Sequence, residues 1–384
     1  MTGNKLEVTK EKKNLELYIH IPFCVRKCRY CDFLSGPASE NTQKEYVKAL
    51  TNEINGIREE AEYSVSSIFI GGGTPSILEA DLIVEIMKCL QEKFTIDDHA
   101  EITIETNPGT LTKEKLMKYR ASGINRLSMG LQSPNGDELK MLGRIHDYSV
   151  FEENYRLARF CGFTNINVDL MFALPDQTPQ KWEENLRKIA ALHPEHISAY
   201  SLIIEEGTPF AAMELNLPSE DDEYQMYEDT AKILREYDYE QYEISNYAQK
   251  GYVCRHNDGY WTMQEYLGLG LGASSLYRGE RFTNTTDLAD YIEYSSSPEQ
   301  IREHRQRLTR ENQIEEFMFL GLRRTEGISK TQFQKCFGVP VEQYYRDVIR
   351  KYTEYALLKD ENDRIFLTRK GIHVSNAVMA EFLL

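Results

Sequence analysis

Several features that would place the chain in a common class of protein are missing from its 384 residues. There is no run of 18 apolar residues that could cross a bilayer as a helix, and residues 1–16 lack the apolar segment of a secretory signal. Basic residues are also few: 45 Lys and Arg stand against 61 Asp and Glu, a formal net charge of −16. This acidity argues against nucleic acid or an anionic membrane as the main partner.

Cysteine is sparse as well, with seven residues in the whole chain. An odd and scattered set of this size does not make a disulfide framework, so we expect a cytoplasmic protein with free thiols. Hydrophobic residues make up 41% of the sequence, which is enough for at least one large core. The length predicts about two domains.

The first two thirds of the chain alternate between predicted strands and helices. Strands are expected at residues 17–21, 65–70, 101–105, 126–131, 165–170 and 196–203. Helices with apolar residues at steps of three and four lie between them. Six such units in a row predict an α/β fold with a parallel sheet, either open or closed into a full or partial barrel. Functional side chains should then gather at the carboxyl ends of the strands.

The pattern changes near residue 250. Leucine and glycine alternate over residues 267–272, which we interpret as a tight turn because the βαβ context of a dinucleotide site is absent. A helical segment is predicted from Gly327 and a hairpin at residues 357–371, which together suggest a small winged-helix-like module. The expected division is a tail at 1–14, a core domain at 15–250 and a C-terminal domain at 251–384.

Three of the seven cysteines, Cys24, Cys28 and Cys31, fall on one short loop after the first predicted strand. Thiolates bind soft metals, and iron–sulfur clusters are normally held by four cysteines. An iron–sulfur cluster with three cysteine ligands and one open iron is favoured here. The alternatives are a zinc site with His20 as a further ligand and three thiols without a metal. Cys89 and Cys161 are expected to be small buried hydrophobes.

Residues 18–31, YIHIPFCVRKCRYC, resemble the cysteine loop of the radical S-adenosylmethionine (SAM) family. The spacing, the preceding strand and the aromatic residue before the last cysteine all agree. In that family three cysteines bind a [4Fe–4S] cluster, and SAM chelates the fourth iron. The resemblance implies both cofactors here, with Cys24, Cys28 and Cys31 as ligands. It also implies a partial (β/α)6 barrel followed by a smaller, helical C-terminal domain.

Other residues at the expected strand ends fit the same resemblance. Gly72, Gly73 and Thr74 belong to a glycine motif whose backbone would approach SAM, and no Gly-Lys-Ser/Thr follows to make it a phosphate loop. The resemblance to the anaerobic coproporphyrinogen dehydrogenase branch implies SAM contacts from Tyr18, Glu105, Gln132, Arg144 and Asp169. Carboxylates can accept from an ammonium or a ribose hydroxyl, and an arginine can pair with a carboxylate. Solvated strand ends are the alternative for each of these groups.

Three features separate the chain from that branch and resemble the HemW group of haem chaperones. The dehydrogenase carries a further cysteine where this chain has Phe33, and a longer segment before its cluster. Residues 256–261, HNDGYW, match the H-N-x-x-Y-W segment of the HemW group, which is implicated in haem binding. The alternative for His256 is a packed, hydrogen-bonded histidine. No C-x-x-C-H occurs, so c-type haem attachment is excluded.

The resemblance therefore implies a protein that binds a [4Fe–4S] cluster, SAM and haem, and passes haem to an acceptor protein. It assigns no catalytic residue and leaves open both SAM cleavage and a homodimer. One alternative is oxygen-independent oxidative decarboxylation of coproporphyrinogen. Another is a radical SAM enzyme acting on RNA through the arginines at 302–310, against which the net charge and the lack of an RNA-binding motif speak.

Overall fold

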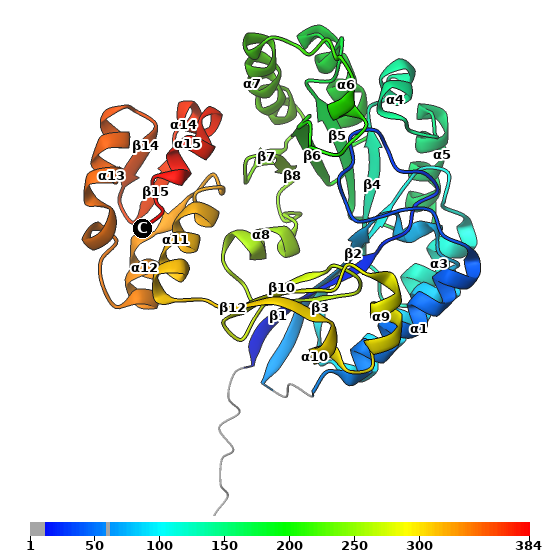
Figure 1. Cartoon of the computed structure of the whole chain (residues 1–384). Coiled ribbons are helices and arrows are strands. Elements are labelled where there is room, and N and C mark those ends of the chain that lie inside the picture. The colour runs from blue at the N-terminus through cyan, green and yellow to red at the C-terminus, as the bar shows by residue number, and fades with distance from the viewer. Residues whose placement is uncertain (1–11, 59–61) are drawn as a thin grey trace, which may run out of the picture.

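The computed structural model describes residues 12–58 and 62–384, and its centre is a twisted sheet of parallel strands (Figure 1). Six strands lie side by side in chain order: β1 (Lys13–Ile21), β2 (Tyr63–Gly72), β3 (Ile96–Thr106), β4 (Arg126–Gln132), β5 (Ile166–Phe172) and β6 (His196–Ser201). The predicted α/β fold with a parallel sheet is confirmed. In the described part of the chain β1 and β6 do not pair with each other, so the barrel is partial and open.

Helices connect these strands and cover the outside of the sheet (Figure 1). They are α1 (Glu40–Gly56), α2 (Ala80–Lys93), α3 (Lys113–Ala121), α4 (Gly136–Leu142), α5 (Tyr148–Phe160), α6 (Pro179–Ala190) and α7 (Glu220–Glu236), with short 3-10 turns η1 (Pro75–Ile77) and η2 (Phe210–Ala212). In α6 the buried Trp182, Leu186 and Ile189 follow helical spacing and enter the main core. The Thr178 side chain caps its first turn by accepting from the Lys181 amide.

The sheet continues on both sides of the parallel strands and crosses the boundary expected at residue 250. Next to β1 lie β9 (Tyr266–Leu269), β10 (Ser274–Tyr277), β11 (Glu280–Asn284) and β12 (Arg302–Arg307), and next to β6 lie β8 (Asn246–Ala248) and β7 (Glu240–Gln241). The turn expected over residues 267–272 is confined to its second half, where Gly270 and Gly272 have positive φ. The first half is a strand, and β9 runs parallel to β1.

Three short helices follow or flank these added strands: α8 (Arg255–Trp261), α9 (Leu288–Tyr294) and α10 (Pro298–Ile301). Helix α8 lies between the sheet and the C-terminal unit (Figure 1). Residues 251–261 carry no apolar periodicity, so the sequence did not predict this helix. It is the element that brings His256 to the inside of the barrel.

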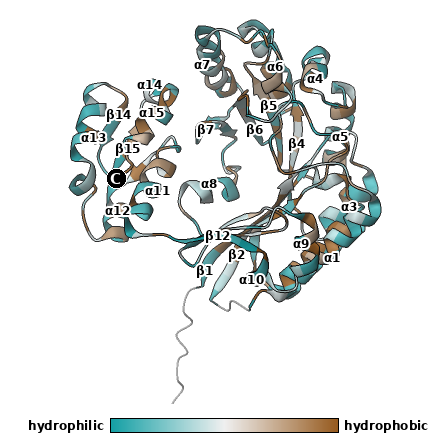
Figure 2. Cartoon of the chain, viewed as in Figure 1, coloured by the Kyte–Doolittle hydropathy of each residue, from teal (hydrophilic) through white to brown (hydrophobic). Residues whose placement is uncertain are grey.

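The C-terminal unit has its own hydrophobic core, which includes Ile314, Phe333, Ile365 and Phe382. Its elements are α11 (Arg310–Gly321), β13 (Ile328–Ser329), α12 (Lys330–Phe337), α13 (Glu342–Glu354), β14 (Leu358–Glu361), β15 (Arg364–Leu367), α14 (Arg369–His373) and α15 (Ser375–Ala380). The hairpin predicted at 357–371 is present as β14 and β15. Figure 2 shows α7 and α13 largely in the hydrophilic colour, as expected for helices at the surface.

Ion pairs join the C-terminal unit to the rest of the chain at three places. Arg324 Nε lies 2.8 Å from Asp258 Oδ1 of α8, Arg369 Nε lies 2.8 Å from Glu228 Oε2 of α7, and Arg281 Nη2 of β11 lies 2.8 Å from Glu316 Oε2 of α11. The C-terminal unit therefore contacts the barrel domain through α8, α7 and β11. Among the described residues, no helix is both long enough and apolar enough to span a membrane.

Candidate functional site

The three clustered cysteines lie on the loop between β1 and α1, which is anchored at several points. The Cys24 amide donates to Gly36 O (3.0 Å), and the Arg29 amide donates to Leu142 O (3.0 Å). All three thiols line a cavity of about 350 Å³ at the carboxyl ends of the strands. No disulfide involves them, and all seven cysteines are free. Cys89 and Cys161 are buried, as expected for small hydrophobic residues.

The donor set of this cavity fits an iron–sulfur cluster better than zinc. Among residues 12–58 and 62–384, no three His, Cys, Asp or Glu side chains converge on a point that could hold one metal ion. Thiolates that ligate different irons of a cluster need not converge in that way. Both ring nitrogens of His20 are also engaged: Nδ1 with the Tyr18 hydroxyl (3.0 Å) and Nε2 with Leu34 O (2.9 Å). Burial raises the pKa of the Cys24 and Cys31 thiols, so metal binding would have to drive their deprotonation.

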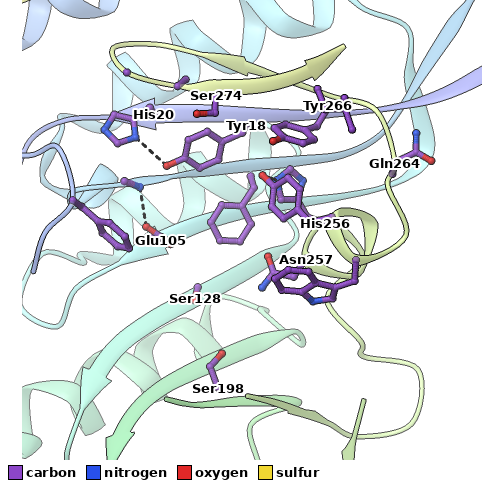
Figure 3. A pocket seen from close by; sticks show the side chains of 18 of the residues that line it. Tyr18, His20, Glu105, Ser128, Ser198, His256, Asn257, Gln264, Tyr266 and Ser274 are labelled. Carbon is purple, nitrogen blue, oxygen red and sulfur yellow. Dashed lines mark hydrogen bonds between the residues drawn. The ribbon is translucent and has the colours of Figure 1, made fainter. Parts of the chain in front are cut away.

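The glycine motif after β2 is required by close backbone packing. A Cβ on Gly73 would lie 2.5 Å from the carbonyl oxygen of Phe23, in the cysteine loop. Gly72 has φ +112°, and its amide donates to Glu105 Oε2 at 3.0 Å (Figure 3). Thr74 is buried and accepts from Asn107 Nδ2 at 2.8 Å. The motif thus joins the cysteine loop to the end of β3, with its backbone facing the same cavity.

Two half-buried carboxyl groups, Glu105 and Asp169, form part of the wall of this cavity. Burial, and next the charge of Asp169, raises the pKa of Glu105 to about 8. Burial also raises the pKa of Asp169, which accepts from Asn167 Nδ2 (2.7 Å) and Ser128 Oγ (3.2 Å). Each carboxyl oxygen can accept more than one hydrogen bond, so the pair can also accept from hydroxyl or ammonium donors of a ligand.

Arg144 links the cysteine loop to the strand ends. Its Nη1 donates to Cys28 Sγ (3.5 Å) and its Nη2 donates to Asn107 Oδ1 (2.7 Å). Its buried Nε has no hydrogen-bond partner in the structure, which leaves one donor for a ligand carboxylate. Gln132, at the end of β4 with φ +73°, lines the same cavity. Sequence reasoning missed Asn107, although it directly follows β3 and precedes a Pro-Gly turn.

A second cavity, of about 600 Å³, adjoins the first and extends toward the C-terminal unit. His256 lines it from α8 (Figure 3). Its Nδ1 is 2.8 Å from Ser67 Oγ and its Nε2 is 2.9 Å from the Tyr260 hydroxyl. Only 1% of the histidine is exposed, and its ring stacks on Phe69 at 5.2 Å. Burial, and next the charge of Arg126, lowers the pKa of His256 to about 3. The histidine is therefore neutral, packed and fully hydrogen-bonded.

The walls of this second cavity are aromatic. Tyr18 stacks on Phe69 at 6.4 Å, and Tyr260 meets Tyr266 edge to face at 4.7 Å. Trp261 also lines the cavity, and its buried Nε1 has no hydrogen-bond partner. Such walls suit a large, flat and mostly apolar ligand. The volume lies within the range of roughly 300–1,000 Å³ typical of small-molecule sites.

Behind His256 lies a buried carboxyl group that sequence reasoning also missed. Glu16 Oε2 is 3.9 Å from His256 Nδ1 and has no hydrogen-bond partner. Burial, and next the charge of Glu101, raises the pKa of Glu16 to about 9. At neutral pH both the carboxyl and the imidazole are therefore uncharged. Glu16 stands between two leucines in a strand whose sequence alternates between apolar and polar residues, so nothing in the sequence distinguishes it from a solvated residue.

The structure brings all the expected site residues together around the two cavities. The smaller cavity, which we call the cysteine cavity, contains Cys24, Cys28, Cys31, Gly72, Gly73, Thr74, Glu105, Gln132, Arg144 and Asp169. The larger one, which we call the aromatic cavity, contains Tyr18 and His256. Phe33, Gly72, Glu105, Ser128, Asp169 and Tyr200 line both. The two cavities are thus neighbouring compartments of one barrel interior.

Comparison with known proteins first defines the class. Residues 18–189 match the radical SAM superfamily, and residues 308–374 match the HemN C-terminal domain. The solved structure of coproporphyrinogen III oxidase (HemN) from Escherichia coli, a radical SAM enzyme, superposes with a TM-score of 0.86 at 25% identity. The match covers 98% of this chain and 91% of that one. The chain is a radical SAM protein with a HemN-type C-terminal domain.

Curated relatives then narrow the class to one family. The heme chaperone HemW of Bacillus subtilis is 36% identical over 372 residues, covering 95% of this chain and 98% of the relative. The heme chaperone HemW of Lactococcus lactis is also 36% identical over 372 residues, covering 96% of this chain and 97% of the relative. The heme chaperone HemW of Escherichia coli is 40% identical over 261 residues, covering 67% of this chain and 69% of the relative. The chain belongs to the HemW family.

Proposed function

We propose that this protein is a haem chaperone that holds a [4Fe–4S] cluster and SAM in the cysteine cavity and carries haem in the aromatic cavity. It would pass the haem to an acceptor protein. The observation that carries the proposal is the pairing of two compartments in one barrel: one is lined by thiols and polar groups, the other by aromatic rings around a neutral histidine. The seven free thiols fit a reducing compartment, and we propose the cytoplasm.

In the cysteine cavity Cys24, Cys28 and Cys31 would ligate the cluster. When bound, the cluster offers SAM an open iron and an electron for its cleavage. Arg144, with its free Nε, would pair with the SAM carboxylate, and the carboxyl groups of Glu105 and Asp169 would accept from its hydroxyls. Gly72 and Gly73 would present backbone to the bound ligand, because both line the cavity and neither has a side chain.

In the aromatic cavity His256 is the proposed iron ligand of the haem. The imidazole is neutral, as an iron ligand must be, and Ser67 fixes its orientation through Nδ1. Nε2 is hydrogen-bonded to the Tyr260 hydroxyl, so haem iron would have to displace that hydroxyl. An exchange of this kind suits a carrier, because the histidine regains a hydrogen-bond partner when the haem leaves.

A haem titration tests the proposal. The purified protein should show a saturable Soret change at one haem per chain, and His256→Ala should shift the Soret maximum and weaken binding at least tenfold. The loss of an iron ligand, rather than of one packing contact, is the reason for this size. His196→Ala is the control, because His196 is also buried and hydrogen-bonded at both nitrogens but lines neither cavity.

Two results would overturn the proposal. One is the absence of a saturable Soret change in the unaltered protein. The other is formation of protoporphyrinogen when the reconstituted protein is incubated with SAM, a reductant and coproporphyrinogen. That product would make the protein a coproporphyrinogen dehydrogenase, as its similarity to HemN would allow.

A further inference from the structure

Phe33 occupies the passage between the two cavities. It lies two residues after Cys31 and lines both the cysteine cavity and the aromatic cavity. Its side chain is 60% exposed and belongs to no hydrophobic core. The ring therefore contributes little to the stability of the fold, and its position needs another explanation.

The backbone on both sides of the Phe33 side chain is anchored. The next residue, Leu34, gives its carbonyl oxygen to His20 Nε2 at 2.9 Å, and Ser35 Oγ donates to Phe33 O at 3.4 Å. Leu34 also fills the space beside Gly272, where a Cβ would lie 2.5 Å from Leu34 Cδ2. The Phe33 ring is thus carried on an anchored stretch of backbone and lines both cavities, where its exposed face is available for stacking by a flat ligand.

Tyr200 faces the same passage from the far side of the barrel. It stands at the end of β6, is 39% exposed and also lines both cavities. β1 and β6 are the first and last of the parallel strands, so the rings of Phe33 and Tyr200 reach the passage from its two ends. The remaining shared residues, Gly72, Glu105, Ser128 and Asp169, come from β2 to β5 between them.

We propose that Phe33 and Tyr200 form an aromatic partition between the two cavities. A flat conjugated ligand in the aromatic cavity rests on the Phe33 ring, and the partition keeps it out of the space that SAM would occupy. The inference rests on the proposed function, because it takes haem as that ligand.

The test measures haem affinity in the cluster-loaded, full-length protein, with and without saturating SAM. In the unaltered protein the two ligands occupy separate compartments, so SAM should leave the haem affinity unchanged. Phe33→Ala should bind haem about 3- to 10-fold more weakly, because it loses one aromatic contact with the ligand. In this variant SAM should lower the haem affinity further, because the two ligands now compete for space. Phe33→Tyr should restore both properties.

The control is Phe160→Ala, which removes a phenylalanine that is 74% exposed and lines neither cavity. Its haem affinity should equal that of the unaltered protein, both with and without SAM. If Phe33→Ala keeps the original haem affinity and stays insensitive to SAM, the partition is wrong while the proposed function stands. If the unaltered protein binds no haem, the proposed function and this inference are both overturned.

Discussion

The two cavities differ in how the residues proposed to bind their ligands are held. In the cysteine cavity Cys28 and Cys31 are partly exposed, and the Arg144 Nε has no partner. In the aromatic cavity both nitrogens of the buried His256 are hydrogen-bonded, to Ser67 and to the partly buried Tyr260. The first site is thus prepared for a ligand, whereas the second must break a hydrogen bond to accept one. This contrast suits a resident cofactor in one compartment and a transferable cargo in the other.

The largest expected effect comes from removing one thiol of the cysteine cavity. Cys28→Ser should abolish the iron–sulfur absorbance after anaerobic reconstitution and lower iron from about four atoms per chain to near zero. A hydroxyl does not replace a thiolate as a soft-metal ligand. Iron content and the visible spectrum measure this.

Cys336→Ser is the matched control, because Cys336 is exposed in the C-terminal unit. Its iron content should equal that of the unaltered protein. Equal iron in both variants would contradict the assignment of the cluster to the β1–α1 loop.

A smaller effect is expected from crowding the backbone of the cysteine loop without changing a cluster ligand. Gly73→Ala places a Cβ 2.5 Å from the Phe23 carbonyl oxygen, and that backbone cannot move without shifting the cysteine loop. We expect a loss of roughly 1–3 kcal/mol in the free energy of unfolding and a lower yield of cluster. Urea unfolding and iron analysis measure the two. Gly36 lies in the same loop with open space around it, so Gly36→Ala should leave the free energy of unfolding and the iron content unchanged. Equal losses in the two variants would contradict the steric argument.

The buried acid behind His256 gives the aromatic cavity a distinct pH dependence. The pKa of Glu16 is raised from 4.5 to about 9, so over this window the native state keeps a proton that the unfolded chain has released. The contribution of Glu16 to the free energy of unfolding is therefore fully present below pH 4.5 and is lost as the pH rises toward 9. Glu16→Gln should remove that slope and stabilise the protein at pH 8 by about 1–2 kcal/mol.

Urea unfolding of the full-length chain at pH 5, 6.5 and 8 measures the slope. Glu214→Gln, at an exposed position, should leave it unchanged. If Glu16→Gln keeps the slope of the unaltered protein, the carboxyl is ionised in the native state and the uncharged pair with His256 does not exist.

The sequence predicts the two regions unequally well. The cysteine loop is local: its spacing, its preceding strand and the glycine motif are visible within a few residues, and the parallel strands bring Glu105 and Asp169 to the same edge. The aromatic cavity is assembled from distant segments. Ser67 on β2 and His256 on α8 are 189 positions apart, and β9 pairs with β1 only through the fold. Neither helix α8 nor the burial of Glu16 has a periodic pattern to announce it.

The smallest expected effect tests the contrast between the two cavities most directly. It comes from removing the hydrogen bond that haem is proposed to displace. Tyr260→Phe keeps the ring that meets Tyr266 but frees His256 Nε2, while Ser67 still holds Nδ1. Haem should then bind about 2- to 10-fold more tightly, the equivalent of one neutral hydrogen bond of roughly 0.5–1.5 kcal/mol. Tyr266→Phe should leave the affinity unchanged. Weaker binding by Tyr260→Phe would instead mean that the hydroxyl contacts the haem, and the aromatic cavity would then be as prepared for its ligand as the cysteine cavity is.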